Sequence, residues 1–152
     1  MNELAYDIAI IGGGPAGTTC ALALKNSGLK VVILEKATFP RDKVCGDAIP
    51  GLAVKTLRQI SPQYAEKLAA LPEKHLTKRT RFWLNDKRKV ELTWVNPAYT
   101  CKRIDFDQQL FEWTKAERSI EVYENCNVQH LAYEADGVTV KCANQLVFHV
   151  KW

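Results

Sequence analysis

The chain has 152 residues, of which 47% are hydrophobic and 25% charged, a balance typical of one globular domain and not of a disordered segment. Its formal net charge of +4 is small and scattered along the chain, which argues against nucleic acid as a partner. The N-terminus lacks a basic segment followed by an apolar core, and the apolar runs are too short to span a membrane. We therefore predict a cytoplasmic protein and leave contact with a membrane surface open.

The cysteines Cys20, Cys45, Cys101, Cys126 and Cys142 stand far apart in the sequence. They form no Cys-x-x-Cys pair and have no histidine pair at ligand spacing, so we predict no metal site. An odd number of cysteines without secretory features favours reduced thiols.

The first fifty residues predict a βαβ unit. Residues 5–11 are a short apolar run ending at glycine, the pattern of a strand buried on both faces. Small and apolar residues then recur at spacings of three and four over 15–27, which predicts a helix that stops at Gly28. Residues 31–34 form a second buried strand that ends at Glu35. The predicted packing face of the helix contains Ala16, Cys20, Ala23, Leu24 and Ser27.

The middle of the chain predicts a loop, two helices and a hairpin. Proline and glycine residues mark a structured loop over 37–51, and a helix follows over 52–60. Ser61-Pro62 has the pattern of an N-cap followed by proline at the first helical position. Residues 79–84 and 88–95 alternate like strands joined at Asn85-Asp86-Lys87. In the second helix, Tyr64, Leu68 and Leu71 are expected to share a face.

The last third of the chain predicts one helix and then a β-meander. Asp105 and Gln108 have the spacing of a capping box, so the helix is expected to start there and run to about Arg118. Residues 120–150 alternate like strands, with turn signals at Asp136-Gly137 and Ala143-Asn144.

A glycine-rich turn carries the strongest functional signal in this sequence. Gly12, Gly14 and Gly17 match G-x-G-x-x-G between a predicted strand and a predicted helix. Gly12 permits a tight reversal, Gly14 leaves room for a pyrophosphate, and Gly17 permits close packing of the helix on the strands. Glu35, at the end of the next strand, is placed to accept hydrogen bonds from an adenosine ribose, and it disfavours the 2′-phosphate of NADP. We therefore predict a site for the ADP half of a dinucleotide.

Three segments carry a resemblance to a known family. YDIAIIGGGPAG (residues 6–17) resembles the opening of FAD-dependent oxidoreductases of the glutathione-reductase-like superfamily. FPRDKVCGD (39–47) is similar to a loop of the geranylgeranyl reductase family, which is related to the aromatic hydroxylases and flavin halogenases. RIDFDQQL (103–110) is similar to the R-x-x-F-D-x-x-L segment of those groups. The resemblance implies an α/β, Rossmann-like FAD/NAD(P)-binding domain with a central parallel sheet, an antiparallel β-meander and the start of a second, antiparallel substrate sheet.

The resemblance also implies a set of cofactor-binding residues. Arg41 and Arg103 would contact the phosphate and ribityl region of the flavin, and Cys45 and Gly46 would lie beside its ring or the substrate channel. A redox role for Cys45 is less favoured than a small residue against the flavin or a plain buried cysteine. No catalytic acid or base is identified. The whole expected set is Gly12, Gly14, Pro15, Ala16, Gly17, Glu35, Lys36, Arg41, Cys45, Gly46 and Arg103.

The family implies an FAD enzyme with NAD(P)H as a candidate electron donor and a small isoprenoid or aromatic molecule as substrate. Reduction of an isoprenoid-type C=C bond is favoured, with an aromatic hydroxylase or monooxygenase as one alternative. A non-catalytic dinucleotide-binding remnant that self-associates through uncovered surface is another, which leaves the activity of the chain open. Because family members are much longer, we expect residues 1–152 to be the N-terminal FAD-binding part of such an architecture, with 72–100 as an excursion into its substrate domain.

Overall fold

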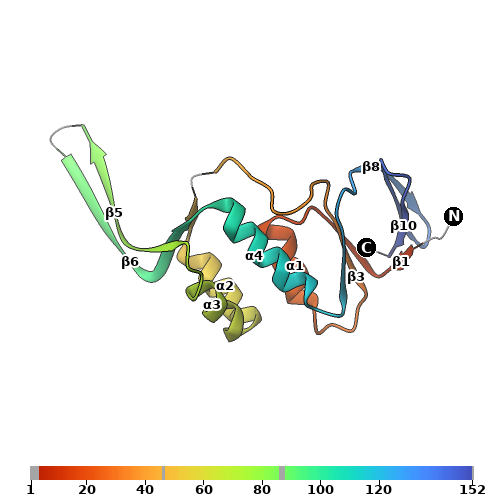
Figure 1. Cartoon of the computed structure of the whole chain (residues 1–152), viewed down its shortest axis with the longest axis horizontal. Coiled ribbons are helices and arrows are strands. Elements are labelled where there is room, and N and C mark those ends of the chain that lie inside the picture. The colour runs from red at the N-terminus through yellow and green to blue at the C-terminus, as the bar shows by residue number, and fades with distance from the viewer. Residues whose placement is uncertain (1–3, 46, 86–87, 152) are drawn as a thin grey trace. The chain divides into compact units, whose positions relative to one another are not determined.

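The computed structural model describes residues 4–45, 47–85 and 88–151 (Figure 1). The described residues divide into two compact units. The first unit lies within Met1–Arg41 and Asp107–Trp152, and the second is Asp42–Phe106. The predicted α/β class is confirmed, since parallel and antiparallel sheets occur together with helices.

A parallel sheet organises the first unit. It contains β2 (Ile8–Ile11), β3 (Val31–Leu34) and β7 (Ile120–Tyr123) in the order β2-β3-β7. Helix α1 (Pro15–Leu24) connects β2 to its parallel neighbour β3, so the predicted βαβ unit is confirmed.

The four residues of β3 are all buried because successive side chains point to opposite faces of the sheet. Val31 and Ile33 pack in one apolar cluster with Ala21 of α1. Val32 and Leu34 pack in a second cluster with the residues of the antiparallel sheet described next. The parallel sheet is therefore covered by a helix on one face and by strands on the other.

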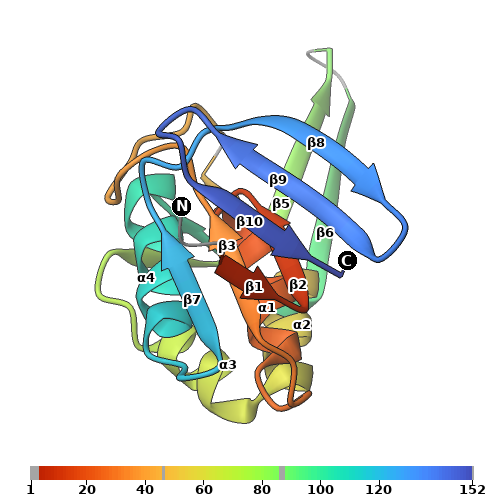
Figure 2. The same ribbon diagram turned by 90° about the vertical axis from the view of Figure 1, so that its right-hand side faces the viewer.

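The antiparallel strands follow one another as a meander. They are β8 (Val128–Glu134), β9 (Gly137–Cys142) and β10 (Val147–Val150), and β1 (Leu4–Tyr6) adds to β10 in parallel. Figure 2 shows them side by side in the order β1-β10-β9-β8. The predicted meander is confirmed from β8 to β10, with turns at Ala135-Asp136 and Ala143-Asn144, but residues 120–123 form β7 of the parallel sheet.

The predicted single strand over 5–11 is instead two strands in two sheets, with Asp7 between them. The Asp7 carboxylate accepts a hydrogen bond from the Lys30 N–H (2.9 Å) and forms an ion pair with Lys151 (2.7 Å). The expected burial on both faces holds for β3 but is wrong for β2, because β2 lies at an edge of the parallel sheet within the described residues. Ile11, at the end of β2, is 55% exposed.

The Asp7 carboxylate is expected to make stability depend on pH. The hydrogen bond from Lys151, followed by that from Lys30, lowers the pKa of Asp7 below its ordinary value. Its contribution is therefore present above the unfolded pKa, about 3.9, and is lost as the pH falls through the lower folded value. We expect Asp7→Asn to lower the urea midpoint at pH 7 and to bring variant and wild type closer together near pH 3. A constant difference between the two proteins across this range would contradict the assignment.

Helix α1 differs from its predicted length and face. It ends at Leu24, three residues earlier than expected, and Gly28 follows with a φ of +78°. Its buried residues are Thr18, Ala21 and Leu22, whereas the predicted face is mainly exposed. Small and apolar residues occur on all sides of this helix, so their spacing does not indicate which face is buried. The close approach of Gly17 to the preceding loop sets the orientation instead.

The second unit packs two helices beside an antiparallel sheet. Helices α2 (Gly51–Ile60) and α3 (Pro62–Ala69) confirm the two predicted helices, and Ser61 with Pro62 stands at the predicted cap. Strands β4 (Ala48–Ile49), β6 (Arg88–Cys101) and β5 (Lys74–Leu84) form the sheet in the order β4-β6-β5. Its buried apolar side chains include Ile49, Val54, Leu57, Tyr64 and Leu68.

The β5–β6 hairpin (Figure 1) is longer than the predicted strands 79–84 and 88–95, and its two faces differ. Arg79 and Arg81 pair with Glu91 on one face, while half-exposed apolar side chains occupy the other. Of the predicted turn, Asn85 has a φ of +57°, and Asp86 and Lys87 lie outside the described residues. The apolar face contains Phe82, Leu84, Val90, Leu92 and Trp94.

Helix α4 (Arg103–Lys115) begins earlier than the predicted capping box and ends before Arg118. Asp105 lies inside its first turn, where its N–H donates to the Lys102 carbonyl oxygen (3.1 Å). The capping box is therefore wrong, because the Asp47 carboxylate accepts the Arg103 N–H (3.2 Å) and allows the helix to start there. No helix within the described residues is long and apolar enough to cross a membrane.

The expected reduced thiols are wrong for two of the cysteines. Cys126 and Cys142 are joined as a disulfide with a Cα–Cα separation of 5.6 Å. The pairing of β8 with β9 places Cys142 opposite Val128, close to the loop that holds Cys126. Cys20 and Cys45 are exposed thiols, and burial raises the pKa of the Cys101 thiol.

Candidate dinucleotide-binding site

The glycine-rich turn lies between β2 and α1, as the sequence predicts. The Gly12 N–H donates to the Leu34 carbonyl oxygen (2.9 Å), and Gly12 has a φ of +104°, a region that side chains disfavour. Gly14 is the N-cap of α1, and the Thr18 N–H donates to its carbonyl oxygen (3.0 Å). The N–H groups of residues 16 and 17 precede this first helical hydrogen bond, so they face the space in front of the helix. This is the arrangement that attracts phosphate groups.

Glycine is required at positions 17 and 14 for two different reasons. A Cβ at Gly17 would overlap the Gly12 carbonyl oxygen, so this glycine permits the close packing of helix and loop. A Cβ at Gly14 would lie 3.1 Å from Nη2 of Arg41 and would enter the space beside the guanidinium. Gly14 has extended backbone angles (φ −71°, ψ −178°), so space and not conformation requires glycine there.

Gly13 is a site residue that the sequence motif did not identify. A Cβ at Gly13 would come within 2.8 Å of the Phe111 ring and 3.3 Å of the Glu35 Cβ. Phe111 is fully buried and stacks on Phe39, with ring centroids 3.9 Å apart and planes 6° apart. The signal in the sequence is a fourth glycine, at a position that the motif leaves open.

Glu35 follows β3 as predicted, but it is only 3% exposed. One carboxylate oxygen accepts the Gly13 N–H (2.7 Å) and the other accepts the Ala37 N–H (2.9 Å). Arg41 lies nearby, with its Nε 3.7 Å from Oε1 of Glu35. Each carboxylate oxygen has a second lone pair, so these contacts leave acceptor capacity for a ribose hydroxyl. Glu35 therefore holds the loop in shape through both of its carboxylate oxygens.

We expect Glu35→Gln to destabilise the protein even without a ligand. The amide NH₂ of glutamine would face one of the two backbone N–H groups and leave it without an acceptor. An unsatisfied buried donor costs about 1–3 kcal/mol. Urea unfolding of the ligand-free variant measures this loss, with exposed Glu134→Gln as the matched control. Equal unfolding midpoints for Glu35→Gln and the wild type would show that Glu35 does not support the loop.

Arg41 completes the group of residues at the turn. Its Nη1 lies 3.4 Å from Oδ2 of Asp107, a fully buried carboxylate on α4. Its guanidinium carbon lies 4.8 Å from the centre of the Phe39 ring. Arg41 is therefore held by two carboxylates and an aromatic ring beside Gly14, and Asp107 and Phe39 are further residues that the sequence did not identify.

The structure brings together part of the expected site. Pro15 and Ala16 open α1, and the exposed Lys36 follows Glu35. Cys45 and Arg103 belong to the second unit, where Cys45 is exposed and Arg103 opens α4. The prediction that Cys45 is a plain buried cysteine is therefore wrong. Gly46 lies outside the described residues.

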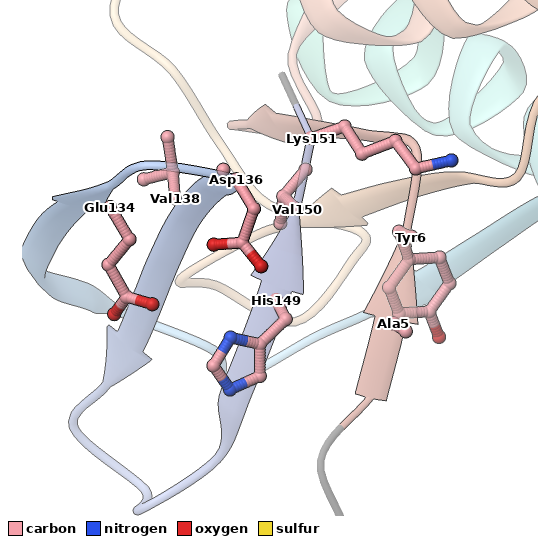
Figure 3. A pocket seen from close by; sticks show the side chains of 9 residues that line it. Ala5, Tyr6, Glu134, Asp136, Val138, His149, Val150 and Lys151 are labelled. Carbon is pink, nitrogen blue, oxygen red and sulfur yellow. The ribbon is translucent and has the colours of Figure 1, made fainter.

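A separate pocket lies beside β1, β10 and the β8–β9 turn (Figure 3). The side chains of Glu134, Asp136 and His149 gather there. Glu134 accepts a hydrogen bond from the Thr139 hydroxyl (2.7 Å), which also contacts Nδ1 of His149 (3.1 Å). The carboxylates of Glu134 and Asp136 make this pocket unfavourable for a diphosphate. Within the part of the chain that is described, its lining includes neither a glycine-rich turn nor a helix N-terminus. The turn at Gly12–Gly17 is the better candidate for a dinucleotide.

Comparison with known proteins identifies relatives of this chain. Residues 5–146 match the family described as FAD binding domain. A menaquinone reductase of Mycolicibacterium smegmatis is 32% identical over 97% of the chain and 38% of the relative. A digeranylgeranylglycerophospholipid reductase of Sulfolobus acidocaldarius is 47% identical over 51 residues, which are 32% of the chain and 11% of the relative.

Solved structures share the fold. The halogenase PltM in complex with phloroglucinol and FAD superimposes with a TM-score of 0.81 at 24% identity. The match covers 97% of this chain and 33% of the halogenase. The chain thus spans a third of the length of that halogenase, and its matches cover 38% and 11% of the two curated relatives.

Proposed function

Since the chain belongs to the FAD binding domain family, we propose that it forms the FAD-binding part of a reductase acting on an isoprenoid-type C=C bond. The cofactor of this family is FAD, and the fold is that of flavin-dependent oxidoreductases, halogenases and monooxygenases. The single observation that carries the FAD-binding part of the proposal is the turn at Gly12–Gly17, with Glu35 and Arg41 beside it.

The residues at the turn fit FAD. The space beside Gly14 that a Cβ would enter is bounded by Nη2 of Arg41, which suits a diphosphate oxygen. In the proposal, Gly12, Gly14 and Gly17 hold the diphosphate against the start of α1, and Glu35 accepts a ribose hydroxyl. Bound FAD would supply the redox chemistry by taking a hydride from a nicotinamide or another reductant and passing electrons to the substrate.

The proposal extends to the remaining expected residues. Pro15 and Ala16 would line the diphosphate from the first turn of α1, and Lys36 would lie at the adenosine end. Arg103, Cys45 and Gly46 would reach the flavin side of the cofactor. Residues 72–100 would belong to the substrate domain of a longer architecture, which agrees with the uncovered apolar face of the β5–β6 hairpin.

Reduction of a polyprenyl double bond is favoured by the 39–47 loop, and the relatives include both a menaquinone reductase and a flavin-dependent halogenase. The two reductases given above are named for menaquinone and for digeranylgeranylglycerophospholipid. The alternative is an aromatic hydroxylase or monooxygenase, in which the substrate is aromatic and molecular oxygen is consumed, and the fold shared with a halogenase and a probable monooxygenase accommodates it equally. A non-catalytic FAD-binding remnant that self-associates is the third candidate.

The test begins with the full chain, refolded or purified with excess FAD and then passed over a desalting column. Retained flavin absorbance in the visible supports the cofactor proposal, and a colourless protein overturns it. Anaerobic addition of NADH or NADPH then tests for bleaching of the flavin. Menaquinone and a geranylgeranyl lipid are supplied to the reduced protein, quinol is reoxidised in air, and fragmentation in the mass spectrometer measures a gain of two hydrogens in the prenyl chain. Saturation of a prenyl double bond supports the reductase. Oxygenation or halogenation of phloroglucinol in air supports the alternative, and retained FAD without turnover supports the remnant.

A further inference from the structure

The Arg41 guanidinium presents its three nitrogen atoms to three different neighbours. Nε lies 3.7 Å from Glu35, Nη1 lies 3.4 Å from Asp107, and Nη2 is the atom nearest to a Cβ built at Gly14. Nη2 has no hydrogen-bond partner within the residues that the structure describes. The guanidinium is a planar fork, so fixing two nitrogens fixes the direction of the third. The nitrogen that remains available therefore points to the glycine-rich turn.

Asp107 is the most deeply placed member of this group. It is fully buried on α4, whereas the side chain of Arg41 is 20% exposed. The guanidinium carbon lies over the Phe39 ring, 4.8 Å from its centre, and Phe39 is itself stacked on Phe111. Asp107 thus holds the guanidinium at Nη1, and the Phe39 ring restricts its movement on one side.

A buried carboxylate close to a diphosphate site would repel an anionic ligand if it acted directly. Arg41 pairs with Asp107 at Nη1 and lies beside Gly14 with Nη2, which gives Asp107 a favourable route of influence through the guanidinium. We propose that Asp107 is a positioning residue that aims Nη2 of Arg41 at the diphosphate of the bound dinucleotide. This inference rests on the proposed FAD site and adds a residue to it.

The expected consequence is selective for ligands that carry a diphosphate. FAD and ADP carry the group that Arg41 meets, whereas adenosine does not. Asp107→Asn keeps the size of the side chain and removes its charge, so Arg41 loses its anchor at Nη1. We expect the Kd for FAD and for ADP to rise about tenfold, as for one weakened charge-assisted hydrogen bond. The Kd for adenosine is expected to stay within about twofold of the wild type.

A double-mutant cycle separates positioning from a general structural role. Arg41→Gln removes the guanidinium, so adding Asp107→Asn to it should cause no further loss of FAD affinity. Fluorescence titration measures FAD binding, NMR titration measures ADP and adenosine binding, and urea unfolding checks the fold of each variant. Exposed Asp42→Asn on the same loop is the charge-matched control and is expected to bind FAD like the wild type.

Each outcome decides the matter. A selective loss for FAD and ADP, together with a non-additive cycle, supports the inference. Unchanged or tighter FAD binding by Asp107→Asn, an equal loss for adenosine, or additive losses overturns it while the FAD site stands. If Asp107→Asn does not fold, Asp107→Ser repeats the test, and failure of both variants to fold makes Asp107 structural and overturns the inference. A wild-type chain that binds neither FAD nor ADP overturns the proposed function itself.

Discussion

Gly14→Val is expected to abolish FAD binding while leaving the chain folded. The backbone of Gly14 is extended, with a φ of −71° and a ψ of −178°, which valine adopts without strain. The valine side chain would instead fill the space beside Nη2 of Arg41, because the Cβ alone would lie 3.1 Å from this nitrogen. We expect the Kd for FAD to rise by more than about a hundredfold, equivalent to about 3 kcal/mol.

Fluorescence titration with FAD measures this loss, and urea unfolding of the ligand-free protein shows whether the fold is retained. Ala23→Val is the matched control, because it adds the same side chain at an exposed position of α1. The control should bind FAD like the wild type. FAD affinity unchanged by Gly14→Val would remove the glycine-rich turn from the site, and with it the main support for the proposed function.

The sequence was a good guide where local pattern decides the structure. The strand–glycine–helix–strand order over residues 8–34 follows from apolar periodicity and glycine chemistry, and the structure confirms it. The division at Asp7 was not predictable in the same way. Residues 5–11 are uniformly apolar apart from Asp7, and the partners that separate them, Lys30 and Lys151, lie far along the chain.

The candidate site shows the same limit. Gly12, Gly14, Gly17 and Glu35 are close in sequence, and their spacing alone predicts that they meet. Helix α4 brings Phe111 and Asp107 to the same turn from about seventy residues beyond Glu35, and tertiary packing alone creates that contact. The buried state of Glu35 also depends on this packing, so the sequence predicted a ligand contact and not a support for the loop.

Gly17→Ala is expected to act on stability where Gly14→Val acts on binding. A Cβ at Gly17 would overlap the backbone oxygen of Gly12 and would come within 3.1 Å of the Ile10 side chain. A backbone carbonyl cannot rotate away as a flexible side chain can, so α1 must shift from the loop and from β2. We expect the free energy of unfolding to fall by about 3 kcal/mol or more, although alanine favours a helix over glycine.

Far-UV circular dichroism during urea unfolding measures the change, and Ala23→Val again serves as the control, with a cost below about 1 kcal/mol. The Gly12 carbonyl is fixed because the Gly12 N–H donates to Leu34 at the end of β3, so a shift of α1 also strains the pairing of β2 with β3. Loss of stability in Gly17→Ala should therefore be cooperative across the parallel sheet and not confined to the helix. An unfolding midpoint equal to that of the wild type would mean that helix and loop do not touch at Gly17. The proposed diphosphate site would then lack the close packing that holds the start of α1 at the end of β2.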